Sequence, residues 1–401
     1  MLAGKRIVLG VSGGIAAYKV ADLASKLVQA GAIVDVIMTA AAQRFVAPLT
    51  FQAITKRPVR TDIYADWLGD DTGHVGLAHN ADLLVIAPAT ANTLARLAVG
   101  LSDDLLCAVY LSTRAPVLLV PAMESGMYLH PATQEHIETL IRRGATVMTP
   151  GEGHLASGAT GVGRLPEVPE IISAVKRALG GGGGPLAGKR VVVTAGGTQE
   201  PLDPVRYIGN RSSGKMGYAI AEAAYYAGAD VILISGPVSL PQPHGISMVQ
   251  VGTAREMEQA VNKAVQGADA LVMAAAVADY TPAHVSDQKI KKSGEKLNIE
   301  LERNPDILGN LAGAELPRLV RIGFAAETQD LIANAVDKLK RKNLDMIVAN
   351  DAVASIGSTS SSLTLISRDG SIEQLPPLPK EEGARMLVER MARIVAERDA
   401  G

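Results

Sequence analysis

Apolar and polar positions follow one another along this chain in a pattern that predicts strands joined by helices. In the first half, continuous apolar runs predict strands over residues 6–11, 33–38, 81–90, 115–123 and 146–150. Helical periodicity covers residues 15–30 and 167–179. Because these apolar runs are nearly unbroken, the strands should be buried on both faces, as in a parallel sheet that helices cover.

The same pattern begins again in the second half. Strands are predicted over 190–195, 230–235, 269–276, 322–328 and 345–349, and helices over 214–227, 253–266, 329–342 and 380–398. The segment 362–376 predicts a hairpin that turns at "RDG". We therefore predict an α/β protein with two doubly wound Rossmann-like domains and mainly parallel sheets. Ligands should bind beyond the carboxyl ends of the strands.

A short repeat marks the start of each half. "LAGKR" occurs at 2–6 and at 186–190, and each copy leads into a strand, a glycine turn, a helix and a segment that begins "AGA". The two parts of the repeat lie 28 residues apart in the first half and 41 apart in the second. The 13 additional residues fall in the loop after strand 190–195, so this loop is a candidate for chemistry that the first half lacks.

Five glycines and a proline at 180–185 separate the halves. Such a run cannot pack in a core and behaves as a flexible tether. We expect a first domain at 1–179, a linker at 180–187 and a second domain at 188–401.

Composition narrows the class of protein. Apolar residues make up 47% of the 401 residues, and the net charge is −2, so no global field favours nucleic acid or an anionic membrane. No apolar run approaches the roughly 18 residues of a membrane span. The single cysteine, Cys107, excludes an intrachain disulfide and a cysteine-rich zinc site. We expect a cytoplasmic protein with small-molecule partners.

Two segments of the first half place small and polar residues after predicted strands. "GVSGGIAAYK" (10–19) forms a strand–helix junction, which binds a phosphate or serves only as a tight turn. "PATANT" (88–93) offers hydroxyl and amide groups suited to the polar edge of a flavin or nucleotide, although Thr90 alone is equally well explained as a helix N-cap.

Three other features of this half are candidates for catalysis. His74 has a side chain able to act as a base near neutral pH, or it is structural. Glu124 follows another buried strand. The glycine-rich segment 153–164 shows no helix or strand pattern and is either a surface loop or a flap over a ligand.

Taken in order, "SGGIAAYK", "PATANT", "PAM…MY" and the glycine-rich segment resemble the flavin-dependent cysteine decarboxylases over nearly the whole first half. The resemblance implies FMN as cofactor and His74 as the catalytic histidine. The implied FMN-binding residues are Gly13, Gly14, Ile15, Thr39, Ala91, Asn92 and Thr93. In the implied reaction, the thiol-bearing carbon of a cysteine-derived substrate is oxidised, the resulting thioaldehyde loses CO₂, and the hydride is returned.

Two positions depart from that family's pattern. Glu124 stands where the family commonly has an asparagine that grips the substrate carboxylate, and Ser157 where it commonly has a proton-donating cysteine. A serine hydroxyl is a much weaker acid than a thiol. A carboxylate at 124 would repel the substrate carboxylate unless burial kept it protonated. Decarboxylation then needs another proton donor, for which Glu124 is one candidate.

The loop after strand 190–195 ends in "GNRSSGKM" (209–216), which nearly matches a phosphate-binding P-loop. Met216 replaces the required hydroxyl and no strand immediately precedes the motif, so a P-loop NTPase is rejected. The glycines and serines still lead into a helix N-terminus, which attracts anions. Arg206 and Arg211 add positive charge, and Asn210 can donate to an oxyanion.

Further along, Asp279 follows a buried strand and would bind a ribose hydroxyl or a metal, or cap a turn. The lysine-rich segment 286–308 has the composition of a solvated hairpin. Lys338 and Lys342 share a helix face, either as an exposed surface or as a phosphate clamp.

The motifs "TAGGTxEPxDPVRxIxNxSSGKMG", "AAAVADY", "KIKK", "NPDIL", "GFAAET" and "VAND" resemble the phosphopantothenate–cysteine ligase half of the coenzyme A biosynthesis bifunctional family over most of 188–355. The resemblance implies that CTP and 4'-phosphopantothenate form an acyl-cytidylate, which L-cysteine attacks. It implies Asn210 at the acyl intermediate with Arg206 nearby. The implied CTP-site residues are Asp279, Lys289, Pro305, Asp306, Ile307, Leu308, Phe324, Lys338 and Lys342. A triphosphate that loses pyrophosphate also calls for a divalent ion, here Mg²⁺, with ligands unknown.

The sequence therefore predicts a bifunctional enzyme of coenzyme A biosynthesis. The resemblance implies a homo-oligomer, with trimeric decarboxylase halves and dimeric ligase halves in a dodecamer. Two alternatives stay open: a nicotinamide-dependent oxidoreductase, whose glycine fingerprint neither turn matches, and an active ligase whose flavin domain is altered or regulatory.

Overall fold

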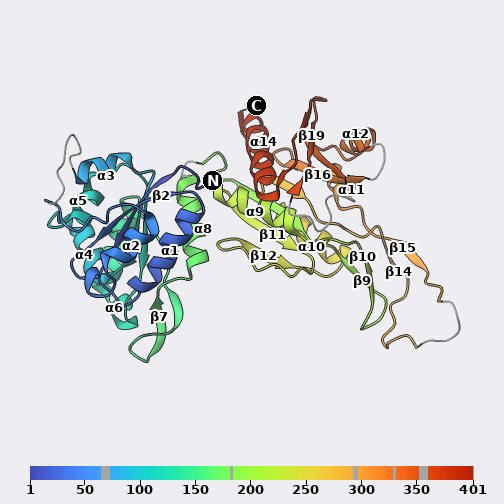
Figure 1. Ribbon diagram of the computed structural model, residues 1–401. Coiled ribbons are helices and arrows are strands. Elements are labelled where there is room, and N and C mark those ends of the chain that lie inside the picture. The colour runs from blue at the N-terminus through green and yellow to red at the C-terminus, as the bar shows by residue number, and fades with distance from the viewer. Residues whose placement is uncertain (65–72, 181–183, 292–296, 328–330, 352–359, 401) are drawn as a thin grey trace. The chain divides into compact units, whose positions relative to one another are not determined.

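The computed structural model describes residues 1–64, 73–180, 184–291, 297–327, 331–351 and 360–400 (Figure 1). The chain divides into two compact units, Met1–Gly181 and Gly182–Gly401, and the division falls within the glycine run. Each unit has its own parallel sheet and its own apolar core. The predicted α/β class is confirmed.

The first unit is built on a five-stranded sheet in the order β2-β1-β3-β4-β5, with all strands parallel. Its strands are β1 (Arg6–Val11), β2 (Ile33–Met38), β3 (Leu83–Ala89), β4 (Val117–Pro121) and β5 (Thr146–Val147). From β1 the chain first adds β2 on one side and later β3 on the other. The strand order therefore reverses between β1 and β3, where doubly wound sheets form their ligand crevice.

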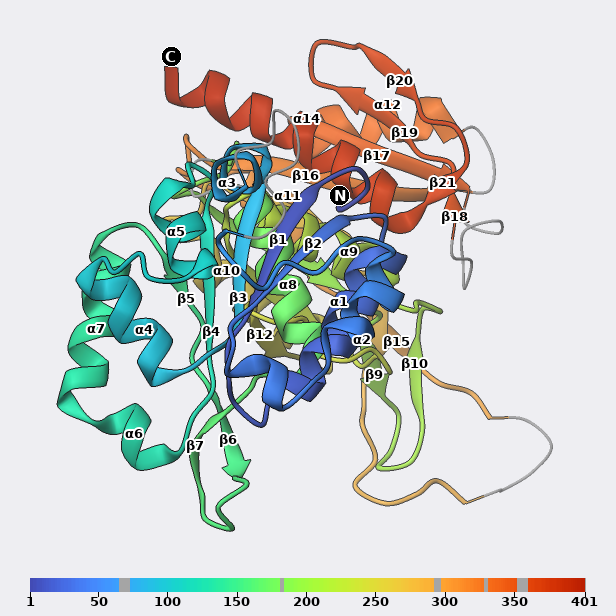
Figure 2. The same ribbon diagram turned by 60° about the vertical axis from the view of Figure 1, so that its left-hand side comes forward.

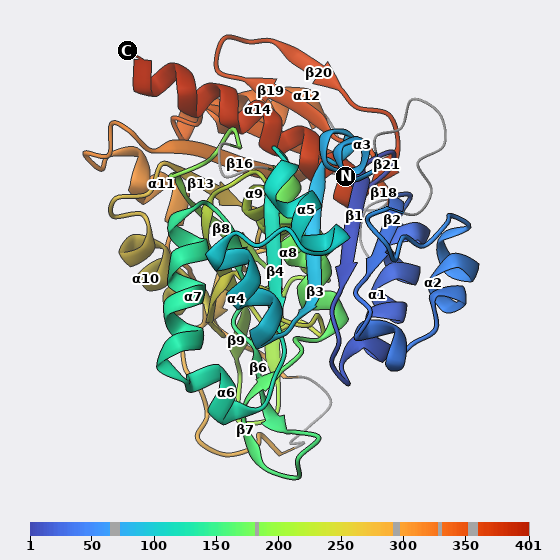
Figure 3. The ribbon, with the colours of Figure 1, turned by 90° about the vertical axis from the view of Figure 1, so that its left-hand side faces the viewer.

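Helices cover both faces of this sheet, as Figure 3 shows for α1 and α2 on one side and α4 and α7 on the other. The first face carries α1 (Ala17–Gln29), α2 (Pro48–Thr55) and α8 (Val168–Gly180), which contribute Leu23, Phe51 and Ile171 to the core. The second carries α3 (His74–Asn80), α4 (Ala91–Val99), α5 (Leu105–Ser112) and α7 (Pro131–Arg142). Two short helices, η1 (Ala42–Arg44) and α6 (Ser125–Leu129), follow β2 and β4.

The glycine-rich segment of this unit is an antiparallel hairpin, β6 (Gly151–His154) and β7 (Thr160–Arg164). The sequence predicted no strand there. Alternate positions of both strands are glycine, so no side-chain alternation exists from which to recognise a strand. The hairpin is fastened to the segment after β4 by a hydrogen bond from Met123 N to Gly163 O of 2.9 Å.

The second unit has an eight-stranded sheet in the order β12-β11-β8-β13-β16-β17-β19-β20. Its parallel strands are β8 (Arg190–Ala195), β11 (Asp230–Ser235), β12 (Ser247–Gln250), β13 (Ala270–Met273), β16 (Val320–Glu327) and β17 (Met346–Asp351). The antiparallel strands β19 (Thr364–Ser367) and β20 (Ile372–Gln374) form the hairpin predicted at "RDG". A small bridge pairs β18 (Ser360–Ser361) with β21 (Leu378–Pro379). The order reverses between β8 and β13.

Helices again pack on both faces. On one face lie α9 (Lys215–Tyr226) and α14 (Lys380–Ala400), which bury Ile220, Leu387 and Met391 against the strands. On the other lie α10 (Ala254–Ala264), α11 (Ile307–Ala312) and α12 (Leu331–Arg341). No helix among the described residues is both long enough and apolar enough to cross a bilayer.

Two short hairpins extend from this unit beside each other, β9–β10 and β14–β15 (Figures 1 and 2). The first consists of β9 (Gln199–Pro201) and β10 (Tyr207–Gly209), and the second of β14 (Tyr280–Pro282) and β15 (Leu301–Arg303). The 13 extra residues after β8 therefore form a hairpin rather than an open loop. Its strands have three residues each, too few for a sequence pattern to reveal.

The repeat "LAGKR" has the same structural role in both units. Lys5 Nζ lies 2.8 Å from Asp82 Oδ1, and Arg6 N donates to Asp82 Oδ2. In the second unit, Lys189 Nζ lies 3.3 Å from Asp269 Oδ1, and the backbone N–H of the next residue donates to Asp269 Oδ2. Asp82 directly precedes β3, and Asp269 directly precedes β13. Each copy of the repeat therefore fastens the first strand of its unit to a neighbouring strand at the amino-terminal edge of the sheet.

Candidate functional sites

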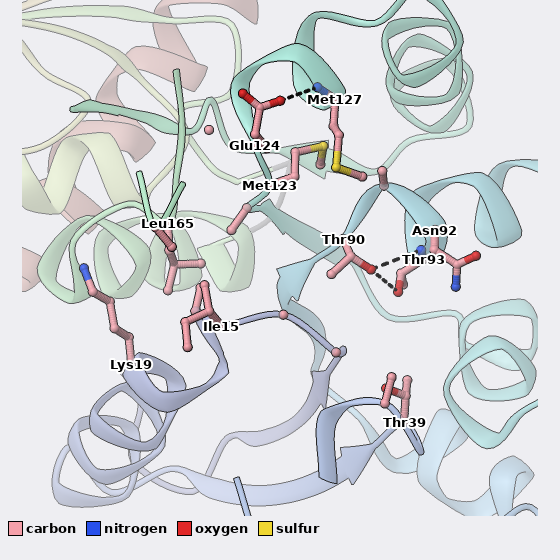
Figure 4. A pocket seen from close by; sticks show the side chains of 18 of the residues that line it. Ile15, Lys19, Thr39, Thr90, Asn92, Thr93, Met123, Glu124, Met127 and Leu165 are labelled. Carbon is pink, nitrogen blue, oxygen red and sulfur yellow. Dashed lines mark hydrogen bonds between the residues drawn. The ribbon is translucent and has the colours of Figure 1, made fainter. Parts of the chain in front are cut away.

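The first unit contains a cavity of about 1160 Å³ at the carboxyl ends of its strands. Its lining comes from the β1–α1 turn, the segments after β2, β3 and β4, and the β6–β7 hairpin (Figure 4). Nine predicted residues line it: Gly13, Gly14, Ile15, Thr39, Ala91, Asn92, Thr93, Glu124 and Ser157. The structure therefore brings these residues together at the reversal between β1 and β3.

The β1–α1 turn requires glycine at position 13. A Cβ placed there would lie 2.3 Å from the Cβ of Ala41, whereas one at Gly14 would come no closer than 3.4 Å to Thr90. The turn is held by Ser12, whose hydroxyl donates to Pro88 O at 2.6 Å and accepts from Thr90 N at 3.1 Å. These bonds connect the end of β1 to the end of β3 across the reversal.

The segment after β3 presents its polar groups to the cavity. Thr90 caps α4, since its Oγ1 accepts from Thr93 N, and the two hydroxyls lie 3.0 Å apart. Asn92 is exposed beside them, and Figure 4 shows its side chain near those of Thr90 and Thr93. Thr90 is therefore an N-cap that also lines the cavity, and its contact with a flavin or nucleotide stays a prediction.

Glu124 also has two roles. Its Oε2 accepts from Gly126 N at 2.6 Å and from Met127 N at 3.2 Å, which makes it the N-cap of α6. The cavity therefore contains a carboxylate at the position where the resemblance implies a neutral amide.

Ser157 lies at the tip of the β6–β7 hairpin and lines the cavity. The chain's one cysteine offers no substitute for the family's thiol. Cys107 is buried in α5, and burial, followed by the nearby Asp104, raises the pKa of its thiol to about 12.

His74 is not in the lining of this cavity as the described residues form it. It begins α3, which packs against α5, and its Nδ1 is buried without a hydrogen-bond partner. His74 and His79 lie on this one short helix, and among the described residues no three His, Cys, Asp or Glu side chains gather as a metal site would require.

The sequence analysis assigned no role to several lining residues, among them Lys19, Arg96 and Arg164. Lys19 belongs to the quoted motif "SGGIAAYK", so its position one turn into α1 was the available signal. Arg96 is paired with Asp103 and Asp104. Nothing in the local sequence indicated that Arg164 would reach the cavity, because that depends on the hairpin.

In the second unit, two threonines join the loops that follow β8 and β13. Thr194 Oγ1 accepts from Ala275 N at 3.1 Å, and Thr198 Oγ1 accepts from Ala278 N at 2.9 Å. Both threonines are fully buried. They hold together the two segments that emerge at the strand reversal.

Asn210 lies on the same edge. Its side-chain amide donates to Val277 O at 3.0 Å, two residues before Asp279. Asn210, predicted at the acyl site, and Asp279, predicted at the nucleotide site, therefore lie on two loops that this hydrogen bond joins. Asn210 is an exposed residue.

Arg206 is committed to a structural contact. Its guanidinium binds the buried Asp203, with Nε 2.9 Å from Oδ2, and Nη2 donates to Ile290 O at 2.9 Å. The hydrogen bonds from Arg206, followed by backbone N–H groups, hold the pKa of Asp203 well below its usual range. Ile290 N also donates to Asp203. This network joins the β9–β10 hairpin to the arm that carries Lys289.

Several predicted CTP-site residues gather around α11, β16 and α12. Lys342 forms an ion pair with Asp306, and Lys338 Nζ donates to Phe324 O at 2.8 Å. Burial lowers the pKa of Lys342, while the charge of Asp279 opposes that shift. Asp279 O accepts from Asn304 N, which places it beside the start of α11.

The remaining predicted residues differ in what they can offer. Ile307 and Leu308 bury their side chains in the core, so only their backbone groups are available to a ligand. Asp306 caps α11, and Pro305 directly precedes it. Lys289 is exposed on the arm. The sequence analysis missed Thr194, Thr198 and Asp203, although "TAGGTQEPLD" contains all three.

Comparison with known proteins defines first the class of each unit. Residues 1–180 match the family model "Flavoprotein", and residues 186–395 match that of the "DNA/pantothenate metabolism flavoprotein C-terminal domain". Over 387 residues the chain is 48% identical to the coenzyme A biosynthesis bifunctional protein CoaBC of Vibrio cholerae, covering 95% of this chain and 96% of that one. It is 46% identical over 397 residues to the protein of that name in Bacillus subtilis, covering 98% of each. The chain belongs to the family of coenzyme A biosynthesis bifunctional proteins.

Solved structures show similarity to each half. The crystal structure of the C-terminal domain of a coenzyme A biosynthesis bifunctional protein CoaBC shares 42% identity, covers 53% of this chain and 99% of that one, and has a TM-score of 0.47. A mutant phosphopantothenoylcysteine (PPC) decarboxylase, complexed with pantothenoylaminoethenethiol, shares 32% identity over 43% of this chain and 97% of that one, with a TM-score of 0.40.

Proposed function

We propose that this chain catalyses two consecutive steps of coenzyme A biosynthesis. The second unit joins 4'-phosphopantothenate to L-cysteine at the expense of CTP, and the first unit decarboxylates the product to 4'-phosphopantetheine. The family membership supports this assignment. The product of one unit is the substrate of the other, which accounts for their fusion in one chain.

In the ligase step, the carboxylate of 4'-phosphopantothenate attacks the α-phosphorus of CTP, forms the acyl-cytidylate and releases pyrophosphate. The amine of cysteine then attacks the acyl carbon, and CMP leaves. Lys289, Lys338 and Lys342 balance the triphosphate charge, with Mg²⁺ as the accompanying ion. Asn210 donates to the acyl oxygen as negative charge develops on it.

One observation carries this assignment: the crossing of the two loops beyond β8 and β13, where Asn210 binds Val277 O two residues before Asp279. An acid and a nucleotide that react must lie within contact of each other. Asn210 and Asp279 lie at the same carboxyl-terminal edge of the sheet, which meets that requirement. Arg206 contributes by holding the arm and the hairpin in place rather than by contact with the acyl group.

In the first unit, the cavity suits FMN. Its volume, the small residue required at position 13 and the hydroxyl and amide groups at Thr90, Asn92 and Thr93 match a flat ring with polar edges and a phosphate. When bound, FMN supplies the acceptor for the hydride of the thiol-bearing carbon. Gly13 and Gly14 leave the backbone open to the phosphate, and the β6–β7 hairpin covers the substrate from water.

The position of His74 supports a site shared between copies of the chain. His74 is absent from the lining that its own described residues form, and its Nδ1 is buried without a partner. We propose that a second copy supplies His74 to the cavity in the homo-oligomer. There it would orient the substrate thiol and accept its proton.

Mass spectrometry of the products tests the assignment directly. Purified protein is incubated with 4'-phosphopantothenate, L-cysteine, CTP and Mg²⁺. The expected product is 4'-phosphopantetheine, and omission of CTP should abolish it. A colourless protein that forms no pyrophosphate would contradict the assignment and favour the nicotinamide-dependent alternative.

A second candidate function rests on Glu124. Its carboxylate accepts hydrogen bonds from two backbone N–H groups at the edge of the cavity, and it would repel a substrate carboxylate. In this alternative the ligase is active and the flavin unit is regulatory. Accumulation of 4'-phosphopantothenoyl-L-cysteine without release of CO₂ would support it.

A further inference from the structure

The second unit contains a cavity far from the candidate ligase residues along its sheet. It has a volume of about 710 Å³ and lies at the amino-terminal ends of β16 and β17, whereas Asn210 and Asp279 follow the carboxyl ends of β8 and β13. Its polar lining consists of Arg321, Arg368, Arg398, Asn343 and Glu315. Three arginines in one lining make it a candidate site for an anion.

One buried carboxylate neutralises part of this charge. Arg398 Nη2 lies 2.6 Å from Asp345 Oδ1, and Arg368 Nη2 lies 3.2 Å from the same oxygen. Asp345 Oδ2 also accepts from the backbone N–H of Arg321 at 2.8 Å. Glu315, the acid in the lining, is exposed. Arg398 anchors α14 to the sheet, and Arg368 anchors the β19–β20 turn to Asn343 and Asp345. Neither contact explains the guanidinium of Arg321.

Arg321 is the unusual member of the group. The residue is only 6% exposed, its Nε is buried without a partner, and its Nη2 makes one long hydrogen bond of 3.4 Å to Ala314 O. Among the described residues, no carboxylate lies within ion-pair distance of this guanidinium. Burial lowers the pKa of Arg321, and the charges of Arg398 and Arg368 add to that shift, while the charge of Asp345 opposes it. A buried cation whose guanidinium has no carboxylate within ion-pair distance is costly to the folded protein.

We propose that this cavity binds a small phosphate-class oxyanion, either inorganic phosphate or the phosphate of a monoester. A tetrahedral dianion would bring acceptors to Arg321, whose Nε has no partner, and to the exposed side of Arg368. Guanidinium groups bind phosphate oxygens through two parallel hydrogen bonds, a geometry that lysine cannot reproduce. The 710 Å³ volume leaves room for an organic substituent on the phosphate.

Isothermal calorimetry with inorganic phosphate tests the site, in chloride buffer at constant ionic strength. The wild-type chain should bind phosphate with saturation. Arg321→Met should weaken the binding at the cavity by about tenfold or more, the cost of one charge-assisted hydrogen bond. It should also raise the melting temperature without phosphate, because it removes a buried guanidinium that makes no ion pair. Arg385→Met, on the same helix as Arg398 and outside the cavity, should change neither result.

Arg368→Gln provides a second test should Arg321→Met fold poorly, because Arg368 is half exposed. It too should weaken phosphate binding. Equal affinity in wild type, Arg321→Met and Arg368→Gln would overturn the proposal. So would a stabilisation that rises with phosphate without saturating in all variants, since excluded anions stabilise any folded protein. Titration with glycerol phosphate separates the two sources: tighter binding than inorganic phosphate identifies a monoester site, and equal binding identifies a site for the free anion.

Discussion

The guanidinium of Arg206 donates to the buried carboxylate of Asp203, with Nε 2.9 Å from Oδ2. Asp203 also accepts from Ile290 N, so one acid joins the β9–β10 hairpin to the lysine-bearing arm. We therefore infer that Arg206, which the sequence placed near the acyl site, acts as a positioning residue. Its effect on catalysis should pass through the arm.

The Asp203 network predicts a loss of order in acid. The pKa of Asp203 is lowered in the folded state, so its contribution to stability is present above the unfolded value of about 3.9 and is lost as the pH falls through the lower folded value. Hydrogen exchange, corrected for the intrinsic rates, should show weaker protection of the two hairpins at pH 3 than at pH 5, with a further loss as the pH falls below 3. Asp203→Asn should lower ligase kcat/KM by roughly 100-fold through displaced groups. Asp287→Asn, exposed on the same arm, is the control, and an equal loss there would refute the argument.

Gly13→Ala should abolish flavin binding. The added Cβ would lie 2.3 Å from that of Ala41 and must displace the turn or the neighbouring segment. Gly14→Ala is a matched control, because its Cβ meets only Thr90 at an ordinary 3.4 Å. Flavin absorbance per mole of purified chain measures the difference. Retention of flavin by Gly13→Ala would show that this turn does not hold the phosphate.

Asn210→Asp should slow amide formation more than it weakens CTP binding. The new carboxylate cannot donate to the acyl oxygen, and it also faces Val277 O without a proton to share. Rapid-quench measurement of amide formation, with CTP affinity measured separately, distinguishes the two effects. Asn262→Asp on the exposed side of α10 serves as control. Unchanged amide formation would remove Asn210 from the mechanism.

Glu124→Asn should lower the KM for 4'-phosphopantothenoyl-L-cysteine in decarboxylation. Asparagine keeps an N-cap acceptor for α6 and removes the charge that repels the substrate carboxylate. The expected change is about tenfold, the effect of one charge-assisted contact. A large loss of CO₂ release instead would identify Glu124 as the proton donor.

A site shared between copies predicts complementation. His74→Asn and Gly13→Ala chains, each inactive in decarboxylation alone, should regain part of the activity when coexpressed with separate tags and purified as mixed oligomers. A mixed site that takes its flavin turn from the His74→Asn chain and its histidine from the Gly13→Ala chain has both groups intact, whereas the reverse combination carries both defects. If the mixed oligomers stay inactive, His74 acts within its own chain or has no catalytic role.

Much of the fold could be predicted because the parallel strands are apolar throughout. Runs such as 190–195 have no other stable environment than a sheet covered on both faces, and the predicted hairpin at "RDG" has a glycine with φ +89° at its turn. The β6–β7 and β9–β10 hairpins escaped prediction because glycine or a length of three residues removes the alternation. Their strands exist because of the segments that they contact.

The candidate site residues also divide into those that a sequence motif predicted and those that depend on distant contacts. Residues within quoted motifs, such as Thr93 and Asn210, occupy the expected edges of their sheets. The role of Arg206 depends on Asp203 and on an arm more than 80 residues away, and no local pattern encodes that contact. The charge of Arg321 lies in an apolar strand and becomes visible only once its surroundings are known.

The ion pairs of Lys5 with Asp82 and of Lys189 with Asp269 connect strands at the amino-terminal edge of each sheet. The candidate site residues lie at the opposite, carboxyl-terminal edge. Insertions at the carboxyl-terminal edge therefore leave these ion pairs unchanged, as the longer turn after β8 in the second unit illustrates. Lengthening a flexible connection adds little entropic penalty. Evolution could thus fit new chemistry to an old scaffold by altering turns alone, and protein engineers could exchange the two turns on the same terms.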